Sequence, residues 1–380
     1  MNPPFDRILV RGVNWLGDAV MTTPALLRLR EAKPAAHITL LIHEKLADLW
    51  TNHPAVDAVL TFSRRSSVWS VAQKLRAGGF HIGLVLPNSL RSALELWLAG
   101  IPQRIGYARP WRNWLLTQRI QSRADFAEMR KRTVDEIKRL VAVSPGEVSP
   151  ASLHGLHPRP AHHLHLYLHL VAALGANPEP LPPRLEVSAE ELAAVKQRFS
   201  LAADVPWLAL NPRAEYGPAK RWPPERFLAA AAEAQKRTNS RWLILGGPAD
   251  FAPATEMTLS LGRLFPSAPP LNLAGRTTLR ELCALLKLCR VLLTNDTGPM
   301  HVAAAVGTPV VAIFGSTSPE LTGPGLSGDA PHHLLKSHAA CAPCFRRACP
   351  IDLRCMTGIN VERVVDAVGK AYASGPPKPL

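Results

Sequence analysis

The chain has 380 residues, of which 47% are apolar and 19% charged, a composition typical of a globular protein with room for two domains. Lysine and arginine number 44 against 29 acidic residues, so the expected partners are anionic: a nucleotide, a nucleic acid or a phosphorylated membrane surface. No apolar run reaches the roughly 18–20 residues of a membrane span, the N-terminus lacks a signal-peptide core, and six cysteines are too few for a disulfide scaffold. We therefore expect a cytoplasmic protein.

Short apolar strands alternate with helices in the first part of the chain. The expected strands are 7–11, 37–42, 58–62, 82–86 and 103–106, and the expected helices are 19–30, 45–51, 68–77 and 89–99. Such alternation with short connections predicts a parallel, doubly wound α/β sheet, so the first domain is expected to be Rossmann-like.

The loop after the first strand, residues 12–18, reads GVNWLGD. Its glycines permit a tight turn at the carboxyl end of the strand, where ligands bind in open α/β sheets. Asp18 has two interpretations here: a helix N-cap, or a carboxylate base at the entrance for a substrate.

Residues 101–141 carry ten Lys or Arg against four acids, interleaved with Tyr107, Trp111 and Trp114. This pattern suits nucleic acid, a phosphorylated sugar or an anionic membrane surface. The structural alternative is a solvated helix face with the tryptophans in the core.

Residues 144–163 form a Pro/His-rich insertion, expected to be a loop. Its histidines and the His165/His169 pair allow a zinc interpretation that the irregular spacing does not favour. A helix at 165–174 and a Pro-rich linker at 175–185 follow. We expect domains at 1–180 and 181–360, then a C-terminal helix and tail at 361–380.

The second half repeats the alternation, with strands at 207–211, 242–246 and 271–273. Lys220 and Arg221 lie between a strand and a helix, where cations can neutralise a departing diphosphate without a metal ion; the alternative is ordinary surface charge. Asp250 follows the next strand and suits either a ribose contact or a helix cap.

Residues 291–316 are expected to form a strand, a turn at 295–298, a helix at 301–306 and a second strand at 310–314. Asp296, Thr297 and Gly298 are residue types that start a helix after a tight turn. The free N–H groups of such a helix end favour an anion such as a pyrophosphate, although a plain capped turn has the same sequence signature.

Four cysteines occur within fifteen positions near the C-terminus, with the pattern C-x2-C-x4-C-x5-C: Cys341, Cys344, Cys349 and Cys355. A structural zinc or iron–sulfur site and buried or redox-active thiols both remain open. A helix at 360–373 is expected to close the chain.

Taken together, four motifs resemble the bacterial heptosyltransferases of lipopolysaccharide core assembly, within the inverting glycosyltransferases of the GT-B fold. The motifs are VNWLGDAVMTTPAL (13–26), NPRAEYGPAKRWPPERF (211–227), TNDTGPMHVAAAVGTPVVAIFGSTSP (294–319) and CAPCFRRACPIDLRCMTGINVERV (341–364). The resemblance spans nearly the whole chain and implies two Rossmann-like domains facing a cleft, with the nucleotide sugar held mostly by the second.

The resemblance implies transfer of L-glycero-D-manno-heptose from ADP-heptose to the heptosyl-Kdo-lipid A inner core, with inversion and no cofactor, at the cytoplasmic face of the inner membrane. Asp18 matches the family's proposed base and Lys220 its phosphate-contacting lysine. The remaining implied substrate contacts are Asn14, Gly17, Arg221, Asp250, Asp296, Thr297, Gly298, Met300 and His301.

Three other functions remain open. The Pro/His insertion departs from the family pattern in the acceptor half, so a transferase that adds the first heptose, or one with another nucleotide sugar or acceptor, is also compatible. The remote rival is an α/β protein that binds nucleic acid through its basic, Trp-rich segment.

Overall fold

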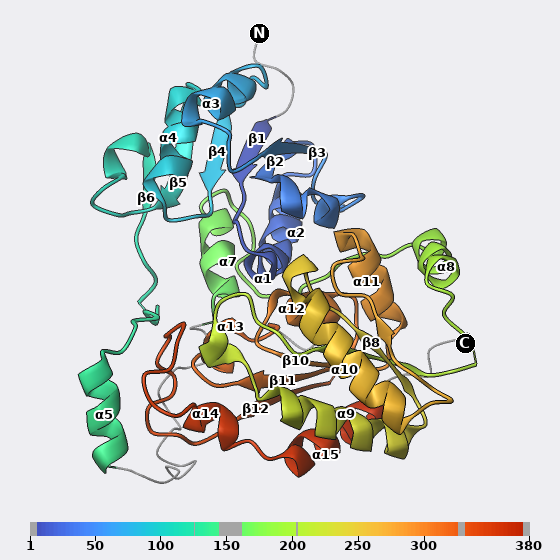
Figure 1. Cartoon of the computed structure of the whole chain (residues 1–380). Coiled ribbons are helices and arrows are strands. Elements are labelled where there is room, and N and C mark those ends of the chain that lie inside the picture. Colours follow the sequence, from blue (N-terminus) through green and yellow to red (C-terminus); the bar gives the residue numbers. More distant parts are fainter. Residues whose placement is uncertain (1–5, 125, 144–161, 203, 326–330, 375–380) are drawn as a thin grey trace. The chain divides into compact units, whose positions relative to one another are not determined.

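The computed structural model describes residues 6–124, 126–143, 162–202, 204–325 and 331–374, which divide into two compact units (Figure 1). Within these ranges the first unit holds residues 6–126 and 162–186, and the second holds residues 127–143 and 187–374. No helix in the described part of the chain is both long and apolar enough to cross a membrane.

The first unit is built on a six-stranded parallel sheet in the order β3-β2-β1-β4-β5-β6. Its strands are β1 (Arg7–Arg11), β2 (His37–His43), β3 (Ala58–Phe62), β4 (Ile82–Val85), β5 (Gln103–Tyr107) and β6 (Gln118–Ile120). The helical elements are α1 (Leu16–Met21), α2 (Thr23–Ala32), η1 (Glu44–Trp50), α3 (Val68–Arg76), α4 (Leu90–Leu98), η2 (Asn113–Leu115) and α7 (Leu164–Ala172).

A buried ion pair lies inside this unit. The Arg11 guanidinium is 2.9 Å from the Glu95 carboxylate, both side chains are almost fully buried, and Arg91 contacts the second carboxylate oxygen at 2.8 Å. Burial lowers the pKa of Arg11, and Glu95 opposes that change. The pair therefore ties β1 to α4 with each charge compensated.

The second unit contains another six-stranded parallel sheet, in the order β12-β11-β10-β7-β8-β9. Its strands are β7 (Trp207–Asn211), β8 (Arg241–Ile244), β9 (Leu271–Asn272), β10 (Leu292–Asn295), β11 (Val310–Phe314) and β12 (His332–Lys336). Its helical elements are α5 (Val134–Val143), α8 (Ala189–Arg198), η4 (Pro218–Lys220), α9 (Pro224–Thr238), η5 (Pro248–Asp250), α10 (Phe251–Leu264), α11 (Leu279–Leu288), α12 (Gly298–Ala305), α13 (Pro319–Thr322), α14 (Arg354–Thr357) and α15 (Val361–Ser374).

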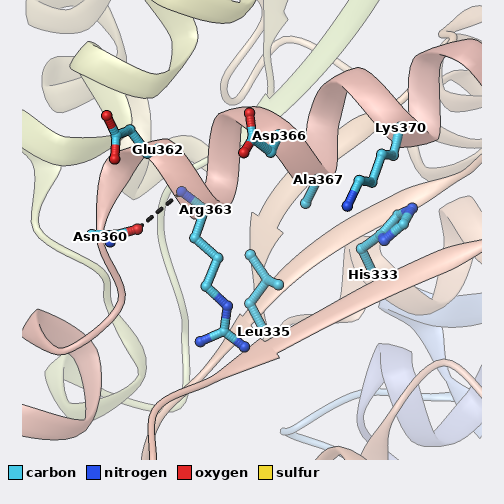
Figure 2. Close-up of a pocket in the computed structure, with 8 residues that line it drawn as sticks. All are labelled: His333, Leu335, Asn360, Glu362, Arg363, Asp366, Ala367 and Lys370. Carbon is cyan, nitrogen blue, oxygen red and sulfur yellow. Dashed lines mark hydrogen bonds between the residues drawn. The ribbon is translucent and has the colours of Figure 1, made fainter.

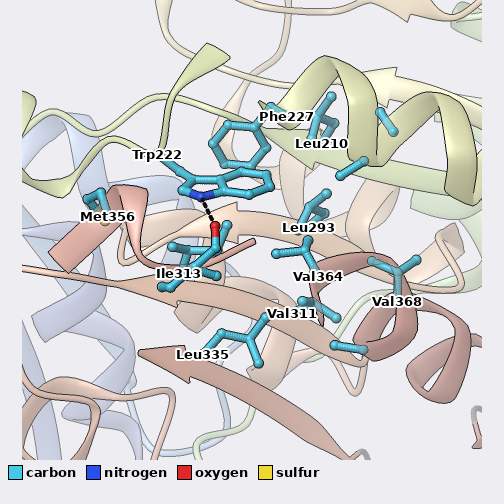
Figure 3. Packing of buried hydrophobic residues seen from close by; sticks show 14 of the residues in the cluster. Leu210, Trp222, Phe227, Leu293, Val311, Ile313, Leu335, Met356, Val364 and Val368 are labelled. Carbon is cyan, nitrogen blue, oxygen red and sulfur yellow. Dashed lines mark hydrogen bonds between the residues drawn. The ribbon is translucent and has the colours of Figure 1, made fainter. Parts of the chain in front are cut away.

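The core of the second unit packs around Trp222, which is fully buried (Figure 3). Its indole N–H donates to the Ile359 carbonyl at 3.1 Å, so the one polar atom of the ring is satisfied. Phe227 packs edge-on against the ring at 5.0 Å. Val364 and Val368 of α15 belong to the same core.

The confirmed α/β architecture differs from the sequence expectation at several boundaries. The expected helix 19–30 is two helices, α1 and α2, and the expected helix 301–306 starts at Gly298. Strands β6 and β12, at the sheet edges, were not expected.

The division of the chain also differs from the expected domains. Residues 127–143 lie with the second unit, where Ile137 of α5 enters the core and the Arg132 N–H donates to the Cys344 carbonyl at 3.1 Å. Helix α15 is core of that unit rather than a separate appendage. The Pro/His insertion lies outside the described residues except for His162 and His163.

The buried ion pair predicts a large difference between two glutamates of the first unit. Glu95→Ala should lower the free energy of unfolding by about 3–5 kcal/mol, because it leaves Arg11 buried and uncompensated. Glu31→Ala, which removes a half-exposed partner of Arg28, should cost less than about 1 kcal/mol. Urea unfolding followed by circular dichroism measures both, and equal shifts would contradict the prediction.

Candidate active site

The candidate residues of each unit follow the strands at which its sheet reverses order. In the first sheet β1 lies between β2 and β4, and in the second sheet β7 lies between β8 and β10. The order reverses between β1 and β4 in the first sheet and between β7 and β10 in the second. The chain connections that follow the two strands of each pair run in opposite directions, which opens a crevice beyond their carboxyl ends. Asp18 follows β1, Lys220 follows β7 and Asp296 follows β10.

Lys220 and Asp296 meet beyond the ends of β7 and β10. The Lys220 ammonium donates to the Asp296 carboxylate at 2.5 Å, and the Thr317 hydroxyl donates to the same oxygen at 2.7 Å. Asp296 is 5% exposed and Lys220 13% exposed. The lysine is therefore held in place by a charged hydrogen bond rather than extended into solvent.

Asn295, the last residue of β10, fixes the loop that carries Lys220. Its side-chain N–H donates to the Pro212 carbonyl at 2.8 Å, and its side-chain oxygen accepts from the backbone N–H of Trp222 at 3.0 Å. Because Asn295 is fully buried, one side chain ties both ends of the loop to the sheet.

Tyr216 supports Lys220 from within that loop. The Lys220 ammonium lies 4.9 Å from the ring centroid, and the Arg347 guanidinium lies 5.2 Å from it. The Tyr216 hydroxyl donates to the Phe345 carbonyl at 3.0 Å. At Gly217 a Cβ would lie 2.4 Å from the Arg347 carbonyl oxygen, so only glycine fits against the cysteine-containing loop.

Helix α12 starts at this site. Thr297 is its N-cap residue, but its hydroxyl lies 3.1 Å from the Thr294 hydroxyl and makes no cap hydrogen bond. Gly298 is the first helical residue and Pro299, the second, has no N–H, so the Gly298 and Met300 N–H groups are the helix-start donors that lack intrahelical acceptors. Met300 is fully buried, and its substrate contact stays a prediction.

His301 is also buried, and its Nδ1 has no hydrogen-bond partner in the described part of the chain. Burial lowers the pKa of His301 to about 4, with Asp296 opposing this and Lys220 adding to it. The ring is therefore neutral near pH 7. It offers a hydrogen bond beside the Lys220–Asp296 pair without adding charge.

Asp250, Arg213 and Arg221 form a second group at the same sheet edge. The Arg213 guanidinium is 3.3 Å from the Asp250 carboxylate, whose other oxygen accepts from the Gly247 N–H at 2.9 Å. Arg221 donates twice to the Ala214 carbonyl, and burial and Arg213 lower its pKa. Asp250 thus serves as a local cap, while both guanidiniums belong to the loop at residues 212–222, which also carries Lys220.

In the first unit Asp18 is the third residue of α1, so it is not the N-cap; that position belongs to Trp15. Asp18 is half-buried. Burial raises the pKa of Tyr167 on α7, and the charge of Asp18 raises it further. Asn14 is exposed in the preceding loop and accepts a long 3.4 Å hydrogen bond from Arg11, and Gly17 lies in the first turn of α1.

The four C-terminal cysteines are free thiols. Cys341, Cys344 and Cys355 are buried in the core of the second unit, and burial raises the pKa of Cys355 to about 12. Among the described residues, histidines included, no group of three or more side chains is arranged to hold a metal ion. The metal interpretations of the cysteines and of His165/His169 therefore gain no support, and His169 instead bonds the Tyr107 hydroxyl at 3.0 Å.

A pocket of about 410 Å³ lies between β12 and α15 in the second unit (Figure 2). Both charge signs line it, with Lys370 beside His333 at one end and Glu362 near Arg363 at the other. None of the predicted site residues lines this pocket.

Sequence reasoning missed Arg213, Tyr216, Thr317 and Tyr167. The first three lie within the motifs quoted above, directly after β7 and β11, so their position at the ligand edge of the sheet was a usable signal. Tyr167 lies on α7, more than a hundred residues from Asp18, and no local pattern connects the two.

Comparisons with known proteins agree with this geometry. The profile of glycosyltransferase family 9 (heptosyltransferase) matches residues 68–141 and 148–354. Lipopolysaccharide heptosyltransferase 2 of Escherichia coli K12 is 30% identical over 84% of this chain and 85% of its own length. Lipooligosaccharide heptosyltransferase 2 of Haemophilus ducreyi is 27% identical over 84% of this chain and 86% of its own length.

The fold agrees as well. The solved structure of E. coli ADP-heptose lipopolysaccharide heptosyltransferase II superposes with a TM-score of 0.76 at 25% identity, over 97% of this chain and 98% of the other. The two parallel six-stranded sheets are thus those of a GT-B enzyme. With a profile that covers most of its length, the chain belongs to glycosyltransferase family 9, the heptosyltransferases.

Proposed function

We propose that this glycosyltransferase moves L-glycero-D-manno-heptose from ADP-heptose to the heptosyl-Kdo-lipid A inner core of lipopolysaccharide. The observation that carries the proposal is the contact between Lys220 and Asp296 at the switch point between β7 and β10. It provides an ordered cation beside the start of α12, which suits a nucleotide diphosphate. The relatives named heptosyltransferase 2 support the choice of sugar and acceptor.

The second unit binds the donor in this proposal. Lys220 and Arg221 face the diphosphate, together with the Gly298 and Met300 N–H groups at the start of α12. These groups stabilise the charge that develops on ADP as the glycosidic bond breaks. Asp250 contacts the ribose, and His301, which is neutral, contributes a hydrogen bond to the sugar or the diphosphate. Asp296 and Thr297 complete the turn.

The first unit binds the acceptor. Asp18 removes the proton of the acceptor hydroxyl as that oxygen attacks the anomeric carbon, and ADP leaves from the opposite side, which inverts the centre. Asn14 and Gly17 line the approach to Asp18. Burial and then the charge of Asp18 raise the pKa of Tyr167, so its hydroxyl keeps its proton and is available as a hydrogen-bond donor in this unit.

The acceptor's lipid anchor sets the location. Lipid A is part of a membrane, so an enzyme that acts on it works peripherally at the cytoplasmic face of the inner membrane. The net charge of +15 suits both a phosphorylated core and anionic lipids.

An acceptor panel tests the function directly. Purified protein with ADP-heptose and Kdo-lipid A carrying no heptose or one heptose should add one heptose to the second acceptor only, read by mass spectrometry. Activity should persist in EDTA, because Lys220, Arg221 and α12 supply the charge that a metal would otherwise supply. Three results would each contradict the proposal: addition of heptose to Kdo-lipid A without heptose, use of another nucleotide sugar in place of ADP-heptose, or complete loss of activity in EDTA that magnesium restores.

Removal of the base gives a sharper test of Asp18. Asp18→Asn should lower turnover by about 10²–10⁴-fold, since the amide cannot accept the acceptor proton. Binding of ADP-heptose, measured by calorimetry, should be unchanged, because the donor is held by the second unit. Glu31→Gln, on the exposed side of α2, is the matched control. If Asp18→Asn still transferred heptose to the acceptor and released ADP at a near-normal rate, Asp18 would be excluded as the base.

Lys220 is tested against another lysine of the same unit. Lys220→Met should lower turnover by about 10²–10³-fold, because the departing diphosphate loses its ordered cation. Lys236→Met, exposed on α9, should leave turnover unchanged. Release of ADP is measured for both, and equal turnover in the two variants would remove Lys220 from the site.

A further inference from the structure

Tryptophan is distributed unevenly between the two units. Of the nine tryptophans, the three in the second unit are buried, whereas five in the first unit are exposed. Four of these five lie between residues 69 and 114: Trp69, Trp97, Trp111 and Trp114, which are 43–66% exposed. We call these four the tryptophan face. Large aromatic side chains exposed together mark an interaction surface.

The tryptophans lie on the outer side of elements whose inner side is already packed. Val71 and Leu75 of α3, Leu96 of α4, and Leu115 of η2 belong to one buried core with the sheet. Trp69, Trp97 and Trp114 come from these same elements but remain exposed, so their exposure is not a packing requirement of the fold. The sequence alternative that places Trp111 and Trp114 in the core is wrong.

Three of the four tryptophans lie at the two ends of α4. Near its C-terminal end the rings of Trp97 and Trp114 pack edge to face, with centroids 5.8 Å apart. Near its N-terminal end the Trp111 indole N–H donates to the Asn88 carbonyl at 3.4 Å, two residues before the exposed Leu90. Arg91 joins this end to α3 by donating to the Ser66 carbonyl, three residues before Trp69.

The charge around the face has one sign. Residues 58–124 contain ten Lys or Arg and a single acid, Glu95, which is fully buried in its ion pair. The surface of this stretch therefore carries no carboxylate. Arg76 donates to the Leu98 carbonyl and Arg119 to the Asn113 carbonyl, next in the chain to Trp97 and Trp114, and Lys74 is exposed on α3.

We propose that the tryptophan face binds an anionic lipid bilayer. Indole rings favour the headgroup region, where an apolar ring meets water and polar groups, and surrounding cations attract anionic lipid. Binding of nucleic acid would also use cations and rings, but it stacks bases on open ring faces, and the edge-to-face contact covers one ring face of the Trp97–Trp114 pair. The inference rests on the proposed function for its biological setting alone.

The Trp111 end of the face lies at the same edge of the first sheet as Asp18. Trp111 and Leu90 follow the carboxyl ends of β5 and β4, the sheet edge at which Asp18 follows β1. Contact of this face with a bilayer would bring the same sheet edge close to lipid-anchored sugar.

The test uses the full-length protein and vesicles of phosphatidylcholine with or without phosphatidylglycerol, measured by co-sedimentation. The protein should bind the anionic vesicles at low salt and lose affinity as salt rises. Trp97→Ser/Trp114→Ser should weaken binding about tenfold or more. Lys74→Gln/Arg119→Gln should weaken it roughly thirtyfold, from about 1 kcal/mol for each charge.

Matched controls come from the exposed surface of the second unit. Leu259→Ser/Leu264→Ser and Lys236→Gln/Arg263→Gln remove the same kinds of side chain and should bind vesicles as the unmodified protein does. The face variants should turn over an acceptor without acyl chains at the normal rate, which would show that they are folded. Their turnover of acceptor embedded in vesicles should be reduced.

Three results would overturn the inference: no binding of the unmodified protein to anionic vesicles, equal binding by the face variants, or tighter binding to single-stranded nucleic acid with the same dependence on Trp97 and Trp114. Vesicle binding is measured without any sugar donor. Tryptophan-dependent vesicle binding by a protein that transfers no heptose would therefore support the face and refute the proposed function.

Discussion

The site in the second unit depends on the pairing of β7 with β10. Thr294 is in register with Asn211, so the loops after these two strands begin side by side, although they are more than eighty residues apart in the chain. Asn295 forms hydrogen bonds with both ends of the loop that carries Lys220, and the Asp296 carboxylate accepts a hydrogen bond from the Lys220 ammonium. An ordered ammonium at the start of α12 is a consequence of strand order, and no local motif could produce it alone.

The electrostatics of the site follow from that arrangement. Asp296 offsets the charge of Lys220 and so allows the lysine to be mostly buried. Arg213 and Arg221 add positive charge to the same loop. His301, with its pKa near 4, adds no charge. A diphosphate at this edge would meet cations held by hydrogen bonds, which need little reorganisation as negative charge moves onto the leaving group.

Prediction from sequence succeeded for the buried central strands and for two edge strands, β3 and β9, and missed the other two edge strands, β6 and β12. Strands β1, β4, β7 and β11 are continuous apolar runs and were identified. Strand β12 reads HHLLK and β6 reads QRI, and such short segments with polar ends show little strand signal, whereas the edge strand β3 reads AVLTF and is rich in apolar and β-branched residues. In the site, Asp18, Lys220 and Asp296 follow recognisable strands, but the effect of the Asp18 charge on the pKa of Tyr167 depends on tertiary packing.

The basic segment at 101–141 shows why composition alone could not choose a partner. The structure divides it: residues up to 124 stay in the first unit, and residues 127–143 lead into α5 of the second unit. Arg112 within it is fully buried and donates to the Pro87 and Tyr107 carbonyls, so it is structural. Once α5 and Arg112 are set aside, the surface that remains combines exposed indoles with unopposed positive charge, and that combination matches a lipid headgroup layer better than a polynucleotide.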